Sequence, residues 1–214
     1  QNKYQFKPPL PFSPGSEVAG VIKSVGDGVT NVQPGDRIVA FTIYGAFAEE
    51  VKTEATRCSP IPLGMDFESA AAFVLTYGTS DHALRDRGQL KAGETLLVLG
   101  AAGGVGVAAI EIGKALGARV IACASSAAKL ERLQSLGADH LLDYTQHKLT
   151  DWVFEKYGKP HRRFYTRGVD VVVNFTGGDT WVPSLRILHR QGRMLTCGAT
   201  AGFDPKEDIR YIDR

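Results

Sequence analysis

One twelve-residue segment restricts the possible folds of this chain more than any other. Residues 95–106 are TLLVLGAAGGVG, an apolar strand followed at once by a glycine-rich turn and the start of a helix. Glycine lets backbone N–H groups approach an anion closely, and a helix N-terminus supplies N–H donors without partners in the helix. This order predicts a pyrophosphate site of a dinucleotide at Gly103, Gly104, Val105 and Gly106. A tight turn that binds no ligand is the alternative.

The segments beyond residue 92 alternate between strand-like and helix-like, which is typical of right-handed βαβ units in a parallel sheet. We expect strands at 95–99, 119–124, 140–143, 169–175 and 193–197. We expect helices at 105–116, 127–136, 149–157 and 180–189. The first helix should bury one apolar stripe, formed by Val105, Ala108, Ala109, Ile112 and Leu116. The fold class is therefore predicted to be α/β, with a Rossmann-type doubly wound parallel sheet.

The first third of the chain has a different character. Residues 15–25, 37–42 and 46–51 are short apolar runs separated by glycine and proline, which predicts short strands in a small barrel or sandwich. Residues 68–73 are alanine-rich and residues 80–90 are compatible with a helix, so a helical bridge should follow. We expect two domains, at residues 1–75 and 76–214.

Composition narrows the range of partners. With 25 basic and 23 acidic residues the net charge is +2, so the chain as a whole has no attraction for nucleic acid or an anionic membrane. No apolar run approaches the roughly 20 residues that span a bilayer, and no secretory signal is visible, which predicts a cytoplasmic location. Cys58, Cys123 and Cys197 are too far apart for a metal knuckle and indicate free thiols.

The residues after the second expected strand predict which dinucleotide is bound. Sites that prefer NAD place an acidic residue about 20 positions beyond the glycine turn, where it holds the ribose 2′-hydroxyl. This chain has no acidic residue between Glu111 and Glu131, and it offers Ser125, Ser126 and Lys129 there. An ammonium group attracts a 2′-phosphate that a carboxylate would repel, so we predict NADPH. In the alternative, Lys129 is an ordinary solvated lysine.

Three long stretches resemble the quinone oxidoreductase (zeta-crystallin-like) branch of the medium-chain dehydrogenase/reductase superfamily. They are PGSEVAGVIKSVGDGVTNVQPGDRIVAFTIYGAFAEEVK (14–52), GTSDHALRDRGQLKAGETLLVLGAAGGVG (78–106) and GKALGARVIACASSAAKLERLQSLGAD (113–139). The resemblance implies a partial GroES-like catalytic domain at 1–75 and a Rossmann NADP(H)-binding domain, incomplete at its C-terminus, at 76–214. It also implies hydride transfer from NADPH to a quinone or another α,β-unsaturated carbonyl.

The same resemblance implies roles for single residues. Those at the adenosine 2′-phosphate are Ser125, Lys129 and Tyr144. Those at the nicotinamide and its ribose are Thr79, Asn174, Gly198 and Ala199. Tyr4 resembles a pocket tyrosine and is the catalytic candidate. Two positions have structural alternatives, since Tyr144 could be a packing aromatic and Asn174 a turn residue that ends a strand.

Zinc-dependent members of the superfamily differ from this chain at their metal ligands. They carry Gly-His-Glu where this chain has Gly15-Ser16-Glu17, and the four-cysteine lobe of many members is absent. A serine supplies no imidazole for zinc, and the five histidines have no metal-site spacing, so we predict no metal. Without zinc as a Lewis acid, reduction of an already polarised acceptor is favoured over oxidation of an alcohol.

Two further readings of the function stay open. Residues 143–211 resemble zinc-type alcohol dehydrogenases as much as quinone reductases, so an alcohol or aldehyde dehydrogenase with its metal ligands outside this chain is one alternative. A non-catalytic NADPH-binding protein is the other. Members of the superfamily begin several dozen residues earlier and continue into a sixth Rossmann strand. We therefore expect this chain to be part of a longer protein, a homodimer when whole, and to be poorly stable or prone to association alone.

Overall fold

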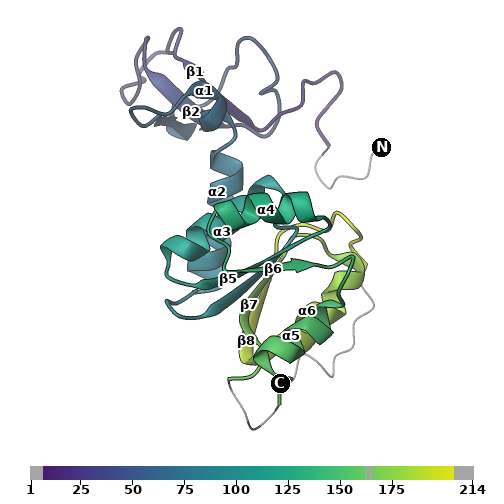
Figure 1. Cartoon of the computed structure of the whole chain (residues 1–214). Helices are drawn as coiled ribbons and strands as arrows, with labels where there is room; N and C mark the ends of the chain where they lie inside the picture. The colour runs from purple at the N-terminus through teal and green to yellow at the C-terminus, as the bar shows by residue number, and fades with distance from the viewer. Residues whose placement is uncertain (1–6, 162, 164–165, 205–214) are drawn as a thin grey trace. The chain divides into compact units, whose positions relative to one another are not determined.

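The computed structural model describes residues 7–161, 163 and 166–204. Contacts divide the chain into two compact units, Gln1–Gly78 and Thr79–Arg214 (Figure 1). The sequence put a domain boundary between residues 75 and 76. Tyr4, the catalytic candidate, lies outside the described residues.

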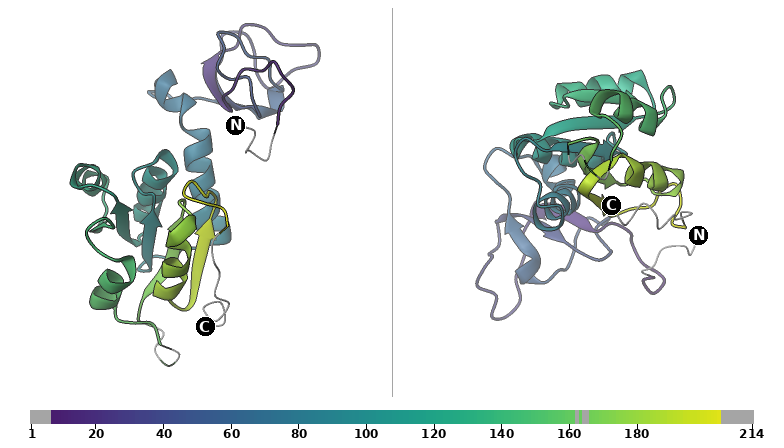
Figure 2. Two further views of the ribbon diagram at one scale, coloured as in Figure 1. Left: turned by 90° about the vertical axis from the view of Figure 1, so that its right-hand side faces the viewer. Right: turned by 90° about the horizontal axis from the view of Figure 1, so that it is seen from below.

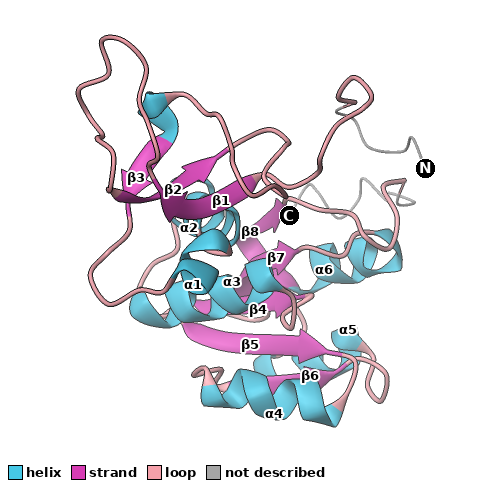
Figure 3. Ribbon diagram, turned by 90° about the horizontal axis from the view of Figure 1, so that it is seen from above, coloured by secondary structure: helices cyan, strands magenta, loops and turns pink. Residues whose placement is uncertain are grey.

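The first unit contains a small antiparallel sheet with the strand order β1-β2-β3 (Figure 3). Its elements are β1 (Glu17–Val21), β2 (Arg37–Phe41), a 3-10 turn (Ala55–Arg57), β3 (Cys58–Pro60) and α1 (Phe67–Ala71). Val39 on β2 packs against Ile61 and Ala70, and these three residues form a core of modest size. The sheet matches the prediction of short strands in this part of the chain.

Two expectations for the first unit were wrong. Residues 46–51 form no strand, because this segment turns back on residues 13–15: the N–H groups of Ala46 and Phe47 donate to the carbonyls of Gly15 and Pro14. β2 pairs with β1 on one side and with β3 on the other, and β3 had not been expected. β3 has only three residues and ends in proline, so it shows no apolar alternation that could have revealed it.

A continuous helical stretch crosses the boundary between the units. It consists of α2 (Val74–Asp81) and a π-helical turn (His82–Arg87). The carboxylate of Glu17 accepts a hydrogen bond of 2.6 Å from the Leu75 N–H in the first turn of α2. The predicted helical bridge is thus present, with its second part wound as a π-helix.

The second unit is a five-stranded parallel sheet in the order β6-β5-β4-β7-β8. Its strands are β4 (Thr95–Leu99), β5 (Arg119–Ala124), β6 (His140–Asp143), β7 (Val169–Asn174) and β8 (Leu188–Thr196). Its helices are α3 (Gly104–Ala115), α4 (Ala127–Ser135), α5 (Leu149–Tyr157) and α6 (Trp181–Ile187), with a 3-10 turn (Gly178–Thr180) before α6. The Rossmann-type fold predicted from the sequence is confirmed.

Helices cover both faces of this sheet (Figures 1 and 2). Leu96 and Val98 of β4 face a core cluster that includes residues of α3 and α4, whereas Leu97 and Leu99 face a cluster with residues of α5 and α6. Successive side chains of a strand point to opposite faces, so a strand covered on both sides is apolar throughout. Every residue of β4 is buried accordingly.

Strand and helix bounds differ from the expectation mainly at the C-terminal end of the sheet. The predicted helix 180–189 ends at Ile187, because Leu188 is extended and pairs with Val169. β8 therefore begins at Leu188 and not at residue 193. Residues 189–191 are polar, so the sequence shows no apolar run that would have indicated a strand there.

The buried face of α3 contains Ala108 and Ala109 of the predicted stripe and, in addition, two glycines. Its buried residues are Gly106, Ala108, Ala109, Ile110 and Gly113, while Val105, Ile112 and Leu116 are only half-buried. A Cβ atom on Gly106 would lie 2.4 Å from the Gly100 carbonyl oxygen, and one on Gly113 would lie 2.7 Å from Leu96 Cδ2. The missing side chains allow α3 to pack directly against the sheet.

These two glycines provide a matched test of the packing. Gly106→Ala meets rigid backbone and should lower the free energy of unfolding by about 1–3 kcal/mol. Gly113→Ala meets the end of a leucine side chain, which can rotate away, and it gains helix propensity, so its cost should be smaller. Thermal unfolding followed by circular dichroism measures both. Equal melting temperatures for the two variants would contradict the packing described.

Candidate functional site

The glycine turn lies at the point where the strand order of the sheet reverses. From β4 the chain proceeds outward to β5 and β6, and it then crosses to the other side of β4 to form β7 and β8. In open α/β sheets a ligand crevice forms at this switch point, outside the carboxyl ends of the strands. A Cβ atom on Gly100 would lie 3.3 Å from Thr176 Oγ1, so the loops that follow β4 and β7 are in contact here.

The turn itself leaves several backbone donors without partners in the helix. Gly100 has a positive φ of 71°, and the Gly103 N–H donates to the Gly100 carbonyl at 3.1 Å. Gly103 is the N-cap of α3 and has no side chain to accept from the first helical N–H groups, which belong to Gly104, Val105 and Gly106. Of the four predicted residues, Gly104, Val105 and Gly106 thus present N–H groups at the start of α3, whereas the Gly103 N–H is engaged by Gly100.

The end of α2 is attached to this turn by a residue that sequence reasoning missed. The buried hydroxyl of Ser80 donates to the Val105 carbonyl at 2.7 Å. Thr79, the neighbour of Ser80, is half-buried. A single serine in a helical segment carries no sequence signal for such a contact.

The residues predicted for the 2′-phosphate come together at the carboxyl ends of β5 and β6. Lys129 Nζ lies 3.3 Å from Ser125 Oγ, and the Tyr144 N–H donates to the Ala124 carbonyl at 3.2 Å. The Tyr144 side chain is 45% exposed, which is not the burial of a core aromatic. Within the part of the chain that the structure describes, no carboxylate lies within ion-pair distance of Lys129.

Asn174 ends β7 with a fully buried side chain. Its Nδ2 donates to Thr180 Oγ1 at 3.0 Å and to Ser184 Oγ at 3.1 Å. Its Oδ1 accepts from the backbone N–H groups of Thr176 and Gly177, at 2.9 and 2.8 Å. These contacts are those of the turn residue that the sequence left open as an alternative. Thr180 and Ser184 were not predicted, although two hydroxyls four residues apart lie on one face of a helix.

Gly198 and Ala199 follow the end of β8 and pack against the loop after β7. A Cβ atom on Gly198 would lie 3.2 Å from the Phe175 carbonyl oxygen. One on Gly177 would lie 3.0 Å from Ala199 Cα. Gly198 and Ala199 therefore lie close to the loop after β7, whose Thr176 and Gly177 N–H groups are bonded to Asn174.

Ser16 and Glu17, which stand where zinc-dependent members have His and Glu, make structural contacts. Ser16 Oγ donates to the Ile43 carbonyl at 3.2 Å, and the Glu17 carboxylate accepts from α2 as described above. Among the described residues, no three His, Cys, Asp or Glu side chains are close enough together to hold a metal ion. All three cysteines are free; desolvation raises the pKa of the Cys197 thiol to about 11 and also raises that of Cys123. The residues present do not fit a zinc site.

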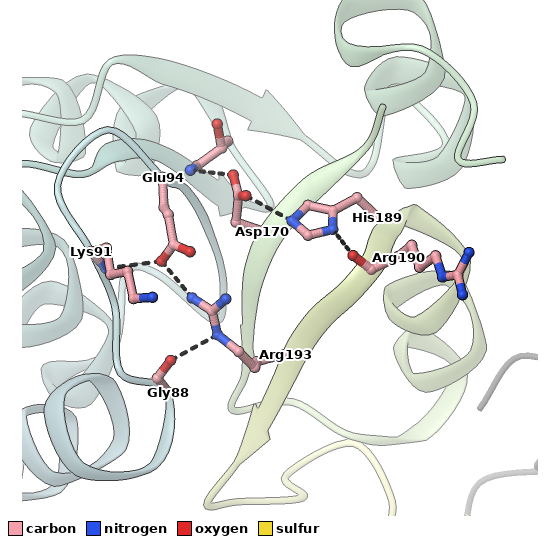
Figure 4. A network of polar contacts seen from close by, with 8 residues as sticks. Gly88, Lys91, Glu94, Asp170, His189, Arg190 and Arg193 are labelled. Carbon is pink, nitrogen blue, oxygen red and sulfur yellow. Dashed lines mark hydrogen bonds and ion pairs between the residues drawn. The ribbon is translucent and has the colours of Figure 1, made fainter. Parts of the chain in front are cut away.

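A charged network lies at the opposite edge of the sheet, around the amino ends of its strands (Figure 4). Asp170 accepts from the Thr95 N–H at 2.7 Å and lies 2.7 Å from His189 Nε2. Arg193 pairs with Glu94 and donates from Nε to the Gly88 carbonyl at 2.8 Å. These contacts join β4, β7 and β8, and we assign them a structural role.

Comparisons with known proteins identify the family. The model of zinc-binding dehydrogenases matches residues 104–212, just over half of the chain, and that of the alcohol dehydrogenase GroES-like domain matches residues 1–65. This chain belongs to the medium-chain dehydrogenase/reductase superfamily. The fold described above, a Rossmann-type sheet and a small antiparallel sheet, is that of its two domains.

The similar proteins place the chain in the quinone oxidoreductase-like branch. It is 35% identical over 203 residues to the rat quinone oxidoreductase-like protein 2 (94% of this chain, 56% of that protein). It is 33% identical to the rat quinone oxidoreductase (94% and 59%). The structure of Escherichia coli quinone oxidoreductase complexed with NADPH aligns with a TM-score of 0.87 at 32% identity, covering 97% of this chain and 62% of that one. This chain thus spans somewhat more than half the length of these relatives.

None of the helices in the described residues combines the length and the apolar character that crossing a bilayer requires.

The network around Glu94 predicts an acid-dependent contribution to stability. Burial acts to raise the pKa of Glu94, but the hydrogen bonds from Arg193 and the Lys91 N–H outweigh it, so the pKa is lowered. The carboxylate therefore stabilises the fold above the pKa of an unfolded glutamate, about 4.3, and this contribution is lost as the pH falls through the lowered value. Glu94→Gln should have a lower melting temperature than the wild type at neutral pH, and the difference should narrow in acid.

Glu131→Gln is the control, because Glu131 is an exposed residue of α4. Its melting temperature should follow that of the wild type at every pH. A deficit of Glu94→Gln that stays constant into acid would show that the lost carboxylate charge is not the cause.

Proposed function

We propose that this chain binds NADPH across the carboxyl edge of its five-stranded sheet and that the whole protein transfers hydride to a quinone or another α,β-unsaturated carbonyl. One observation carries the cofactor assignment. Lys129 Nζ lies beside Ser125 Oγ at the end of β5, with no carboxylate at the position where NAD-preferring sites hold a ribose hydroxyl. The similarity to an NADPH-bound quinone oxidoreductase supports the same assignment.

The pyrophosphate is assigned to the turn between β4 and α3. The N–H groups of Gly104, Val105 and Gly106 at the start of α3 suit its negative charge, and the helix dipole adds to the attraction. Gly103 leaves room for the phosphates, since a Cβ atom there would have only the Gly100 carbonyl oxygen within 4 Å, at 3.5 Å. At Gly106 the absence of a side chain serves the packing of α3 against the sheet.

The 2′-phosphate is assigned to Ser125, Lys129 and Tyr144. Hydrogen bonds in which one partner is charged contribute about 1.5–3 kcal/mol each, more than those between neutral groups. The exposed Lys129 can turn from Ser125 to a phosphate without breaking an ion pair, because the described residues give it none.

The nicotinamide half is assigned to the other side of the switch point. A dinucleotide lies across this crevice, so with its adenosine at β5 its second half extends toward β7 and β8. Thr79, Gly198 and Ala199 are the proposed neighbours there, together with the loop that Asn174 holds. Tyr4 stays a proposed pocket residue of the domain at residues 1–75.

The proposed reaction needs no metal from this chain. When bound, NADPH supplies the hydride, and a conjugated carbonyl is already polarised to accept it. The protein orients the two partners and excludes water. Oxidation of an alcohol by the zinc route is disfavoured because Ser16 and Glu17 are engaged elsewhere.

A fluorescence titration of the chain with NADPH and NADH tests the cofactor assignment. The wild type should bind NADPH more tightly than NADH. Lys129→Glu should weaken NADPH binding by about 10- to 100-fold, because one attraction of about 1.5–3 kcal/mol is replaced by repulsion. NADH binding should change little.

Lys156→Glu is the matched control, with the same change of charge in the last turn of α5. Tyr157, its neighbour, accepts from Gly168 just before β7 begins, so Lys156 belongs to the opposite edge of the sheet. This variant should bind NADPH as the wild type does. Equal affinity of the wild type for NADPH and NADH would refute the 2′-phosphate site.

Steady-state turnover tests the proposed chemistry. Oxidation of NADPH should depend on an added quinone, and a chelator or added zinc should leave the rate unchanged, since the described residues hold no metal site. Alcohol oxidation that requires zinc would favour the dehydrogenase alternative. Tight NADPH binding without turnover would favour a non-catalytic NADPH-binding protein.

A further inference from the structure

The side chain of Asn174 has no hydrogen-bonding capacity left for a ligand. A primary amide has two N–H donors and an oxygen with two lone pairs. Both donors go to hydroxyls, of Thr180 and Ser184, and the oxygen accepts from two N–H groups of the loop that follows β7. The group is fully buried, so water does not compete for these bonds.

The two hydroxyls are satisfied in turn. Thr180 Oγ1 donates to the Gly177 carbonyl at 2.6 Å, and Ser184 Oγ donates to the Thr180 carbonyl at 2.7 Å. Ser184 is itself fully buried on α6. The end of β7, the 3-10 turn and the first turn of α6 are thus joined by one closed network.

The loop fixed in this way holds the loop that follows β8. Gly177 pairs with Gly202 in a parallel bridge, and the N–H groups of Gly178 and Ala201 donate to the carbonyls of Gly202 and Thr176, at 2.9 and 2.8 Å. Gly177 has a φ of 70°, and a Cβ atom on it would lie 2.5 Å from the Gly202 carbonyl oxygen. The contact therefore requires both the backbone conformation that Asn174 stabilises and the absence of a side chain at residue 177.

We propose that Asn174, Thr180 and Ser184 are positioning residues for the nicotinamide half of the cofactor. They do not touch the ligand; they hold the loop at residues 175–178, and through it the loop at residues 198–202, in the form that lines the β7–β8 side of the crevice. This inference rests on the proposed function, which sets the cofactor across the switch point. The Asn174 side chain then acts on cofactor binding through these two loops and not by touching the cofactor.

The network should affect one half of the cofactor only. None of its hydrogen bonds involves Ser125, Lys129 or Tyr144, which lie at the ends of β5 and β6 on the other side of β4. A loss of the network should therefore weaken the binding of a ligand that reaches β7 and β8. It should not affect a ligand that stops at the adenosine end.

Two probes separate these halves. NADPH has both, whereas adenosine 2′,5′-bisphosphate carries the 2′-phosphate and the adenosine but no nicotinamide. Asn174→Ala and Thr180→Val should each raise the Kd of NADPH by about tenfold, equivalent to about 1.4 kcal/mol, with the Kd of the bisphosphate unchanged. Gly177→Ala, which breaks the loop contact while the Asn174 side chain stays in place, should give the same pattern.

Conservative variants should restore binding. Thr180→Ser keeps the hydroxyl and should bind NADPH as the wild type does. Asn174→Asp keeps an oxygen for the Thr176 and Gly177 N–H groups, but each hydroxyl must give up its bond to a carbonyl in order to donate to the carboxylate. It should bind NADPH more tightly than Asn174→Ala and less tightly than the wild type. Val153→Ala, in the core under α5, is the control for lost stability. It should lower the melting temperature with no change in the ratio of the two dissociation constants.

The possible failures are distinct. If Asn174→Ala weakens NADPH and the bisphosphate equally, or weakens neither, the positioning role is overturned while the cofactor site stands. If the wild type binds neither probe, the proposed function fails and this inference fails with it.

Discussion

The position of α3 depends on the absence of a side chain at Gly106. A Cβ atom at that position would overlap the backbone of Gly100 and Ala101, so any other residue would push the helix away from β4. Only with the helix in place do its first N–H groups lie at the carboxyl edge of the sheet, where an anion can reach them. The packing of the second unit and its capacity for a ligand thus rest on the same close contact.

Glycines at the far side of the crevice act in a comparable way. Gly177 and Gly178 have positive φ angles, and their backbones approach the loop after β8 closely. The two loops lie against each other because no side chain separates them and because Asn174 holds the first of them from within. One edge of the sheet therefore combines backbone donors, a lysine that has no ion pair among the described residues, and loops fixed by buried hydrogen bonds. The opposite edge is joined by the Asp170–His189 and Glu94–Arg193 pairs.

Much of the second unit could be predicted from the sequence because parallel strands covered on both faces are continuous apolar runs. β4 and β5 have the predicted bounds for that reason. β6 also has the predicted bounds, although only Leu142 of its residues is buried. The buried face of α3 was predicted only in part, because Gly106 and Gly113 contribute no hydrophobic signal although they pack most closely. β3 and the start of β8 could not be predicted, because β3 is short and the start of β8 is polar. Both segments are strands only through their pairing with a neighbouring strand.

The residues of the candidate site could be proposed from their chemical type, but the contacts that each of them makes could not be predicted. A lysine and two serines after β5 indicate a phosphate by their chemistry alone. The sequence could not distinguish whether the Asn174 side chain faces a ligand or its own loop. The answer depends on whether the hydroxyls of Thr180 and Ser184 lie within hydrogen-bond distance of the amide in the fold. The contacts favour the loop.

The central claim is that a dinucleotide lies across the carboxyl edge of the sheet. Mapping the backbone amide resonances of the chain by NMR during a titration with NADPH tests this most directly. The account predicts shifts confined to the loops after β4, β5, β6, β7 and β8 and to the first turns of α3 and α4, with Gly104, Lys129 and Gly198 among them. Shifts around Glu94 and Asp170 at the opposite edge, or no shifts at saturating NADPH, would contradict it.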